Sequence, residues 1–301
     1  MKKIITLLAL MLCSCWSASS LAFTCQSLGQ PVHGLDSTIS VHVNLTPSIN
    51  AGENLVVDLS QSIQCRNDAP QQYLDPIRIG TGAAYQGALK SFTGSISYFG
   101  NKYPFPLNSP TASINHTWGS YRGWQTTLYL TPISTASGVV INAGDLFASL
   151  ILEKLDLAAG TITQRIVWNL YANNSVVIPT GGCDVSARDV TVNLPNYPGS
   201  TAVPVSVHCA KNQQLGYYLS GTTDKTSNSI FSNTASGSPA KGIGVQLLRN
   251  GTALPTRNTI SLGTVGTSPV NLGLTAAYAR TSGQLTAGNV QSIIGVTFVY
   301  Q

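Results

Sequence analysis

The chain has 301 residues, enough for one large all-β domain or two smaller ones, each with a buried core. Charged residues make up only 9% of the chain, against about 25% in ordinary soluble proteins, and Gly, Thr, Ser, Asn and Val are abundant, which favours strands and turns over long amphipathic helices. Without Lys2 and Lys3 there are 14 basic against 11 acidic residues, a surplus too weak to predict a nucleic-acid partner.

The first 22 residues have the pattern of a secretory signal peptide. Two lysines open the segment, residues 4–12 are apolar, and residues 20–22 form a cleavage site with small residues. Cleavage there makes Phe23 the first residue of the mature chain. A lipoprotein signal at either leader cysteine is disfavoured, because the residues before each cysteine do not suit one. No later segment reaches the roughly 18 apolar residues of a membrane span, so we expect a mature protein that is soluble or held at the cell surface by other subunits.

The four cysteines after the leader predict two disulfides. An even number of cysteines in an exported chain indicates a disulfide framework. The wide gap between Cys65 and Cys183 favours pairing Cys25 with Cys65 and Cys183 with Cys209. Zinc is disfavoured because the chain has no CxxC pair and its four histidines are scattered, so we expect no metal and no cofactor.

Short alternating runs, separated by Gly, Pro, Asn and Ser, predict strands along the first half of the chain. In 41–45 the apolar residues face one way and His42 and Asn44 the other, as in a half-buried strand. The other expected strands are 55–59, 77–79, 95–98, 126–130, 147–152 and 166–171. This close spacing predicts a β-sandwich.

The run 179–182, Pro-Thr-Gly-Gly, breaks the strand pattern just before the second cysteine pair and predicts a short linker. We therefore expect a first domain at 23–178 and a second at 183–301. Expected strands in the second domain are 190–194, 203–207, 217–219, 245–248, 260–262 and 293–300. These are about six strands, one short of the seven in an immunoglobulin-type sandwich.

Several motifs resemble the type 1 fimbrial tip adhesin family of enterobacteria. They include Phe23-Thr24-Cys25, Cys65-Arg66-Asn67-Asp68, Tyr103-Pro-Phe-Pro106, the run from Pro179 to Asp189 and the C-terminal run from Gly295 to Gln301. The resemblance spans the whole chain and implies two immunoglobulin-like sandwiches, a lectin domain followed by a pilin domain that lacks its last strand. It implies export through the periplasm, with a pilus chaperone and then an adjacent tip subunit donating the missing strand, and an outer-membrane usher that delivers the chain to the fimbrial tip.

The C-terminal run carries the features expected of a subunit bound by a pilus chaperone. Tyr300 matches the family's penultimate aromatic residue and Gly288 its glycine fourteenth from the end. Ile294, Val296, Phe298 and Tyr300 share one face of the last expected strand. Only two residues precede Cys25 after the leader, so the mature chain has no arm to donate, and we expect it to accept a strand at the tip.

The resemblance also implies a sugar pocket at one end of the first domain. Phe23 matches the family's N-terminal Phe, whose α-amino group donates to the sugar. Asn67, Asp68 and Asp75 match further polar contacts. Buried polar groups of this kind reject the wrong epimer because it leaves them unpaired.

The opposite wall of the expected pocket departs from the mannose-binding pattern. Lys154, Asp156 and Gln164 stand at polar wall positions, with Tyr73 and Ile162 at the rim. Because a galactose and N-acetylgalactosamine-binding branch has a lysine at the Lys154 position, we expect a terminal galactoside of a host glycoprotein, with mannose as the alternative. The aromatic and basic stretch 118–124 is a further candidate for contact with an extended glycan.

Two other functions compete with this prediction. A glycosidase would use Asp68 and Asp75 as paired carboxylates, but no feature of the sequence isolates one of them to raise its pKa, so we expect no enzyme activity. A purely structural pilus subunit would not need the additional domain that we expect at 23–178, ahead of the pilin domain. The sequence therefore favours a lectin.

Overall fold

The computed structural model describes residues 23–32, 36–133 and 136–301, and the predicted signal peptide lies outside them. These residues form strands and turns, with one short 3-10 helix, η2 (Gly87–Leu89). None of the described helices is long and apolar enough to cross a membrane. The all-β prediction is confirmed.

Residue contacts divide the chain into two compact units, each built from separated segments. Unit 1 contains the residues up to Asn44, Asp58–Leu128 and Ala143–Asn174. Unit 2 contains Leu45–Val57, Tyr129–Asn142 and Ser175–Gln301. Strands β4 (Asn54–Asp58) and β12 (Thr126–Leu130) each straddle a boundary between these segments. The boundary expected at 179–182 stays a prediction.

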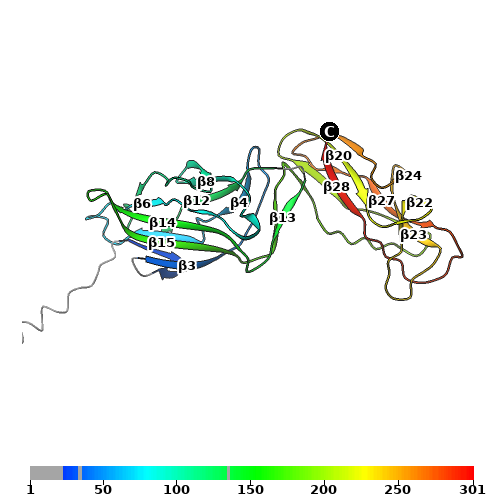
Figure 1. Ribbon diagram of the computed structural model, residues 1–301, viewed down its shortest axis with the longest axis horizontal. Helices are drawn as coiled ribbons and strands as arrows, with labels where there is room; N and C mark the ends of the chain where they lie inside the picture. The colour runs from blue at the N-terminus through cyan, green and yellow to red at the C-terminus, as the bar shows by residue number, and fades with distance from the viewer. Residues whose placement is uncertain (1–22, 33–35, 134–135) are drawn as a thin grey trace, which may run out of the picture. The chain divides into compact units, whose positions relative to one another are not determined.

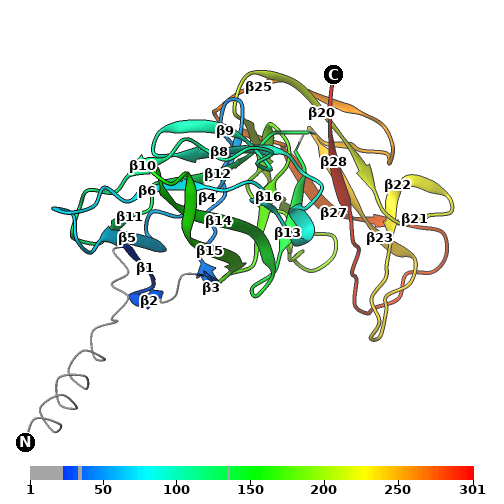
Figure 2. The same ribbon diagram turned by 60° about the vertical axis from the view of Figure 1, so that its left-hand side comes forward.

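The smaller sheet of unit 1 holds the start of the described chain (Figure 2). Its order is β11 (Arg122–Gly123), β5 (Ile63–Asn67), β1 (Phe23–Ser27) and β2 (Gln30–Val32). Cys25 lies directly opposite Cys65 in the β1 and β5 register, and the two form the predicted disulfide. Pairing of β1 with β5 therefore fixes which residues of β5 neighbour Phe23, the first described residue.

The larger sheet of unit 1 is organised around two long strands that lie side by side in Figure 1. Its order is β10 (Ile114–Asn115), β6 (Pro76–Ile79), β14 (Leu146–Asp156), β15 (Thr161–Ala172) and β3 (Asp36–Val43), and β7 (Ala84–Tyr85) also pairs with β14. Val41 and Val43 are buried while His42 is exposed, which confirms the predicted alternation in β3. β8 (Gly94–Tyr98) and β9 (Asn101–Phe105) form a hairpin. The core contains Tyr98, Trp124 and Trp168.

Unit 2 consists of three sheets and a strand pair, β13 (Gly138–Ile141) with β16 (Val176–Pro179). The first sheet has the order β17 (Cys183–Val185), β19 (Ser206–Cys209), β26 (Val270–Asn271), and Cys183 and Cys209 form the second predicted disulfide. The second has the order β18 (Ser200–Ala202), β27 (Leu274–Arg280), β23 (Ile243–Arg249), β22 (Ser227–Ser232), β21 (Thr223–Asp224), with β24 (Thr252–Ala253) on β23. The third has the order β25 (Ile260–Val265), β20 (Gln213–Ser220), β28 (Gly295–Tyr300).

Two expected strands of unit 2 differ from the structure. Residues 190–194 form no strand, although Val190, Val192 and Leu194 are half-buried and alternate with exposed residues. Side-chain alternation alone does not make a strand, because a strand also needs a hydrogen-bonded neighbour. Of the expected strand 203–207, only Ser206 and Val207 lie in a strand, β19. Residues 203–205 form the gap between β18 and β19, and this gap contains Pro204, which has no backbone N–H to donate to a ladder.

Candidate functional site

The start of β1 and the end of β5 meet at one end of unit 1. The antiparallel register places Phe23 directly opposite Asn67, although 44 residues separate them along the chain. The Phe23 side chain is fully buried, and its ring packs edge-on against His116 with the centroids 5.2 Å apart. The structure therefore brings together three of the expected site residues, Phe23, Asn67 and Asp68.

Asn67 organises the loop that follows β5. Its buried Nδ2 donates to the carbonyl oxygens of Tyr73 at 2.6 Å and His116 at 2.8 Å, and its Oδ1 accepts from the backbone N–H of Ala69 at 2.7 Å. Both amide hydrogens are therefore used within the protein. Asn67 shapes the loop between Asp68 and Asp75, and direct contact with a sugar stays a prediction for it.

Asp68 is held from two sides at the protein surface. Its carboxylate accepts from Arg66 Nε at 2.7 Å and from the hydroxyl of Thr24. The Asp68 side chain remains 22% exposed, so it is accessible to a ligand while its orientation is fixed. Fixed acceptors lose less entropy on binding, which is the geometry that a hydroxyl-rich ligand requires.

Asp75 is the buried carboxylate of the site. Lys154 Nζ lies 2.6 Å from its Oδ1, while its Oδ2 is buried with no hydrogen-bond donor. Burial raises the pKa of the Asp75 carboxyl, and the hydrogen bond and charge of Lys154 oppose that increase. A buried acceptor without a partner is unfavourable, so a ligand hydroxyl that reached Oδ2 would gain a strong hydrogen bond.

The register of β14 explains how Lys154 reaches Asp75. Lys154 lies opposite Ile77 of β6, two residues after Asp75, and opposite Gln164 of β15, which is buried. Three of the expected wall and site residues, Lys154, Gln164 and Asp75, thus gather at one end of the sheet. The Lys154 ammonium is bonded to the protein, so it contributes to the site mainly by positioning the carboxylate.

Asp156 stands apart from this group. Its Oδ1 accepts from the backbone N–H groups of Ala158 and Ala159 at 2.9 and 3.0 Å, and the residue is exposed. It stabilises the turn between β14 and β15, and a role in sugar binding stays a prediction.

Apolar side chains are exposed on the segments around the carboxylates. The expected rim residues Tyr73 and Ile162 are about half exposed, and so are Leu74 and Leu157, which the sequence analysis did not select. Leu74 directly precedes Asp75, and Leu157 begins the turn after β14. Exposed apolar groups beside fixed polar acceptors are typical of ligand sites.

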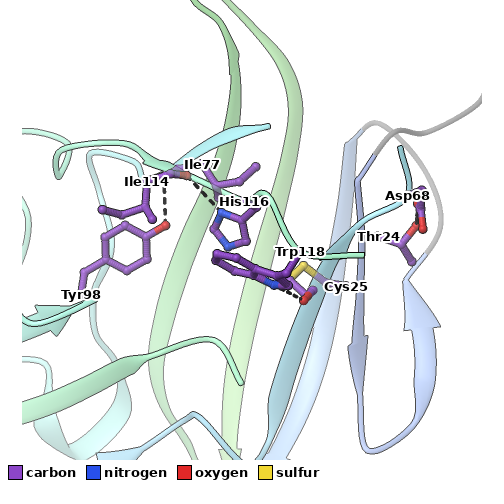
Figure 3. The surroundings of a disulfide bond; sticks show 9 residues. Thr24, Cys25, Asp68, Ile77, Tyr98, Ile114, His116 and Trp118 are labelled. Carbon is purple, nitrogen blue, oxygen red and sulfur yellow. Dashed lines mark hydrogen bonds between the residues drawn. A yellow bond between two sulfur atoms is a disulfide. The ribbon is translucent and has the colours of Figure 1, made fainter. Parts of the chain in front are cut away.

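His116 is the main residue that the sequence analysis missed. It is fully buried, its Nδ1 is 3.1 Å from the Ile114 carbonyl, and its Nε2 has no hydrogen-bond partner. Its backbone N–H donates to the carbonyl of Asp75 at 3.0 Å. Burial lowers the pKa of the imidazole to about 4. Figure 3 shows His116 between Ile114 and Trp118, and the His116 and Trp118 ring centroids are 4.3 Å apart. His116 therefore packs against the Phe23 ring, and its backbone is hydrogen-bonded to both Asn67 and Asp75.

A second candidate site is a groove within unit 2, whose lining contains both apolar and polar residues. It has a volume of about 1140 Å³, and its apolar lining includes Val190, Val192, Leu194, Ile294, Val296 and Phe298. Ile293, which also lines it, is 77% exposed. Tyr300 is half-exposed and does not belong to the lining. Among the described strands, β28 pairs only with β20, so its other edge has no partner strand. The groove therefore combines exposed core residues with a free strand edge.

Gly288 lies beside this groove, where two backbone segments approach each other closely. A Cβ at Gly288 would lie 2.4 Å from the carbonyl oxygen of Ser238 and 2.5 Å from the backbone nitrogen of Ala240. Only glycine fits this position without a shift of the backbone.

Comparison with known proteins gives one consistent result. A family model described as FimH, mannose binding, matches residues 25–169, and one described as Fimbrial protein matches residues 173–301. The chain is 56% identical to the type 1 fimbrin D-mannose specific adhesin of Escherichia coli, with 100% of both chains covered. It is 37% identical to the S-fimbrial protein subunit SfaH of Escherichia coli, covering 95% of this chain and 99% of SfaH.

Among solved structures, the CupB6 tip adhesin from Pseudomonas aeruginosa aligns over 92% of this chain and 94% of its own, at 15% identity and a TM-score of 0.29. This value is too low to add to the argument. The two family models together cover both parts of the chain, and the 56% identical relative covers all of it. The chain therefore belongs to the family of type 1 fimbrial adhesins.

Proposed function

We propose that this fimbrial adhesin binds a terminal mannoside of host glycoproteins through the site at Phe23, Asp68 and Asp75. The observation that carries the proposal is the juxtaposition of a fixed, exposed carboxylate and a buried carboxylate with an unpaired oxygen, next to the expected N-terminus of the mature chain. Sugar hydroxyls are donors in fixed directions, so such acceptors select one stereoisomer.

Two observations favour mannose over the galactoside that we expected from the sequence. The 56% identical relative carries D-mannose specificity in its name. The galactoside expectation depended on Lys154, whose ammonium is 2.6 Å from Asp75 and is thus engaged by the protein. Galactoside binding is therefore not supported, and mannose, the alternative, is the better assignment.

The experiment uses the full chain, produced together with a pilus chaperone and exported so that its leader is processed by the cell, with the N-terminus checked by mass spectrometry. Calorimetry with methyl α-mannoside and methyl β-galactoside measures the specificity. We expect binding of the mannoside, and a loss of at least 10-fold in affinity in Asp75→Asn. Asp36→Asn, which changes an exposed carboxylate of the same unit, is the matched control. Preference for the galactoside, or an unaffected Asp75→Asn, would overturn the proposal.

One extra residue before Phe23 tests the proposed role of its amine. The extension moves the positive charge away from Asp68 and should lower mannoside affinity, while the register of Phe23 with Asn67 keeps the fold intact. If the extended protein bound the mannoside with full affinity, the amine of Phe23 would not be part of the site.

We also propose that the groove of unit 2 accepts a β-strand, first from a periplasmic chaperone and then from the adjacent tip subunit after passage through the usher. The support is the free edge of β28 and the apolar lining of Ile294, Val296 and Phe298. An inserted strand would satisfy the backbone groups of β28 and cover the lining. A full chain that is stable and monomeric when exported without a chaperone would contradict this proposal.

A further inference from the structure

Two pairs of arginine and aromatic side chains lie at β11, the edge strand of the small sheet. The Arg66 guanidinium carbon is 4.6 Å from the centre of the Tyr121 ring, and that of Arg122 is 5.5 Å from the centre of the Trp118 ring. Both distances are within the range of cation–π contacts. Stacking restrains a guanidinium and leaves the N–H groups in its plane available to a ligand.

The two arginines differ in their remaining partners. Arg66 bonds to Asp68 through Nε, so its charge is partly balanced. Arg122 is exposed, and no carboxylate lies within ion-pair distance of it in the part of the chain that the structure describes. The edge of β11 therefore has a net positive charge with one guanidinium that no acidic group of the described chain balances.

This edge is connected directly to the proposed sugar site. The Trp118 indole N–H donates to the Cys65 carbonyl at 3.0 Å, and the Trp118 carbonyl accepts from the backbone N–H of Asn67 at 2.9 Å. Figure 3 shows Trp118 beside His116 and close to the disulfide that joins β1 and β5, with Thr24 and Asp68 nearby. In register, Arg122 lies opposite Cys65, two residues before Asn67.

The loop before β11 also approaches the loop that carries the carboxylates. An added Cβ at Gly119 would lie 3.3 Å from the Pro70 side chain. Gly119 and Ser120 are exposed and add little side-chain bulk, which leaves the loop before β11 open. A glycan whose terminal sugar occupies the site at Phe23 and Asp68, and whose next residues leave towards β11, would meet Arg122.

We propose that the edge of β11 is a subsite for a carboxylate-bearing sugar of an extended glycan, with Arg122 as the residue that binds the carboxylate. The planar guanidinium matches a carboxylate by two parallel hydrogen bonds. A neutral sugar would leave this charge unpaired, which is why an acidic sugar is the better occupant. This inference rests on the proposed function, because it places the subsite beside the mannoside site.

The test compares one hybrid-type N-glycan that carries both a terminal mannose and a sialic acid with the same glycan after sialidase treatment. Binding of the full exported chain is measured by calorimetry at about 20 and 300 mM salt. We expect the sialylated glycan to bind about 3-fold to 10-fold more tightly at low salt, and this preference to shrink at high salt, because exposed ion pairs are screened.

Arg122→Gln removes the charge and keeps a side chain of similar polarity. It should abolish the preference and leave affinity for the sialidase-treated glycan unchanged. Lys90→Gln is the matched control, because it removes one exposed positive charge from unit 1 beside η2, which contacts β14 near Leu146, far along that strand from Lys154. It should keep the preference. Melting curves establish that both variants fold.

The outcomes separate this inference from the proposed function. Equal affinity for both glycans, or a preference that persists in Arg122→Gln, overturns the subsite while mannoside binding stands. Arg122-dependent binding of the sialylated glycan without any methyl α-mannoside binding supports the subsite and overturns the proposed mannoside function. If no glycan binds, both are overturned.

Discussion

The proposed sugar site of unit 1 and the groove of unit 2 present opposite kinds of surface. In the site, Asn67, Asp68 and Asp75 are fixed by hydrogen bonds and an ion pair before any ligand arrives. In the groove, Ile294, Val296 and Phe298 are apolar and β28 has a free edge. We expect the first to recognise a ligand by preorganised polar groups, and the second by incomplete burial of a core. Substitutions should therefore affect the two regions in different ways.

The largest effect is expected in the groove. Phe298→Asp would bury a charge as soon as another strand covers the groove, which costs several kcal/mol. We expect loss of strand acceptance and of display on fimbriae. Thr297→Asp, on the exposed side of the same strand, should leave display intact. Electron microscopy and surface labelling measure the result, and normal display of Phe298→Asp would contradict the assignment.

Lys154→Met should produce the largest effect in the sugar site. It leaves Asp75 buried without its cation, and breaking such a pair costs about 3–5 kcal/mol. Denaturant unfolding measures this loss. The double variant Lys154→Met/Asp75→Asn should recover much of the stability, because no charge remains unpaired. An equal loss in both variants would mean that packing, and not charge, explains the effect.

The pH dependence of the free energy of unfolding should reveal the low pKa of His116. Its folded pKa of about 4 is below the unfolded value of 6.5, so protons bind preferentially to the unfolded state. The stability that the neutral imidazole provides is complete above pH 6.5 and is lost as pH falls towards 4, by about 3 kcal/mol.

The difference between the wild type and His116→Gln isolates this effect. Asp75, whose pKa is raised by burial, acts in the opposite direction and is common to both proteins. Parallel stability curves for the two proteins between pH 4 and 6.5 would exclude His116 as the source.

The smallest effect is expected at Gly288. Gly288→Ala should cost about 1–3 kcal/mol, because its Cβ would overlap the backbone at Ser238 and Ala240. Gly237→Ala is the matched control, since a Cβ there meets no atom within 4 Å. Thermal unfolding checks both, and equal melting temperatures would show that the backbone adjusts freely.

The sequence could predict features that leave a signal in a short run of residues, such as an alternating strand, or in a pair of residues, such as two cysteines. Alternation at 41–45 located the end of β3, although the strand begins at Asp36 and stops at Val43, and the spacing of Cys25, Cys65, Cys183 and Cys209 predicted both disulfides. Alternation failed at 190–194, because the partner that would make this segment a strand is not encoded in its own residues. The free edge of β28 likewise depends on which strands pair with one another, and the residues of β28 alone do not specify this.

The details of the proposed sugar site depended on register. Asp75 and Lys154 were selected from the resemblance, but their ion pair follows from the alignment of β14 with β6, which no short motif specifies. His116 was considered only as a metal ligand and excluded. Its importance arises from burial among Phe23, Phe99 and Trp118, which lie far apart in sequence.

The disulfide between Cys25 and Cys65 has a consequence for where the protein becomes active. It joins the two strands whose ends carry Phe23 and Asn67, and it closes a loop that spans a sequence separation of 40 residues. Such a crosslink contributes roughly 3–4 kcal/mol by restricting the unfolded chain, and it forms in oxidising compartments but rarely in the cytosol. A reduced chain inside the cell would hold its first strand weakly. Competence to bind sugar would thus be acquired only after export, and a chain that failed to leave the cytosol would not capture intracellular glycans.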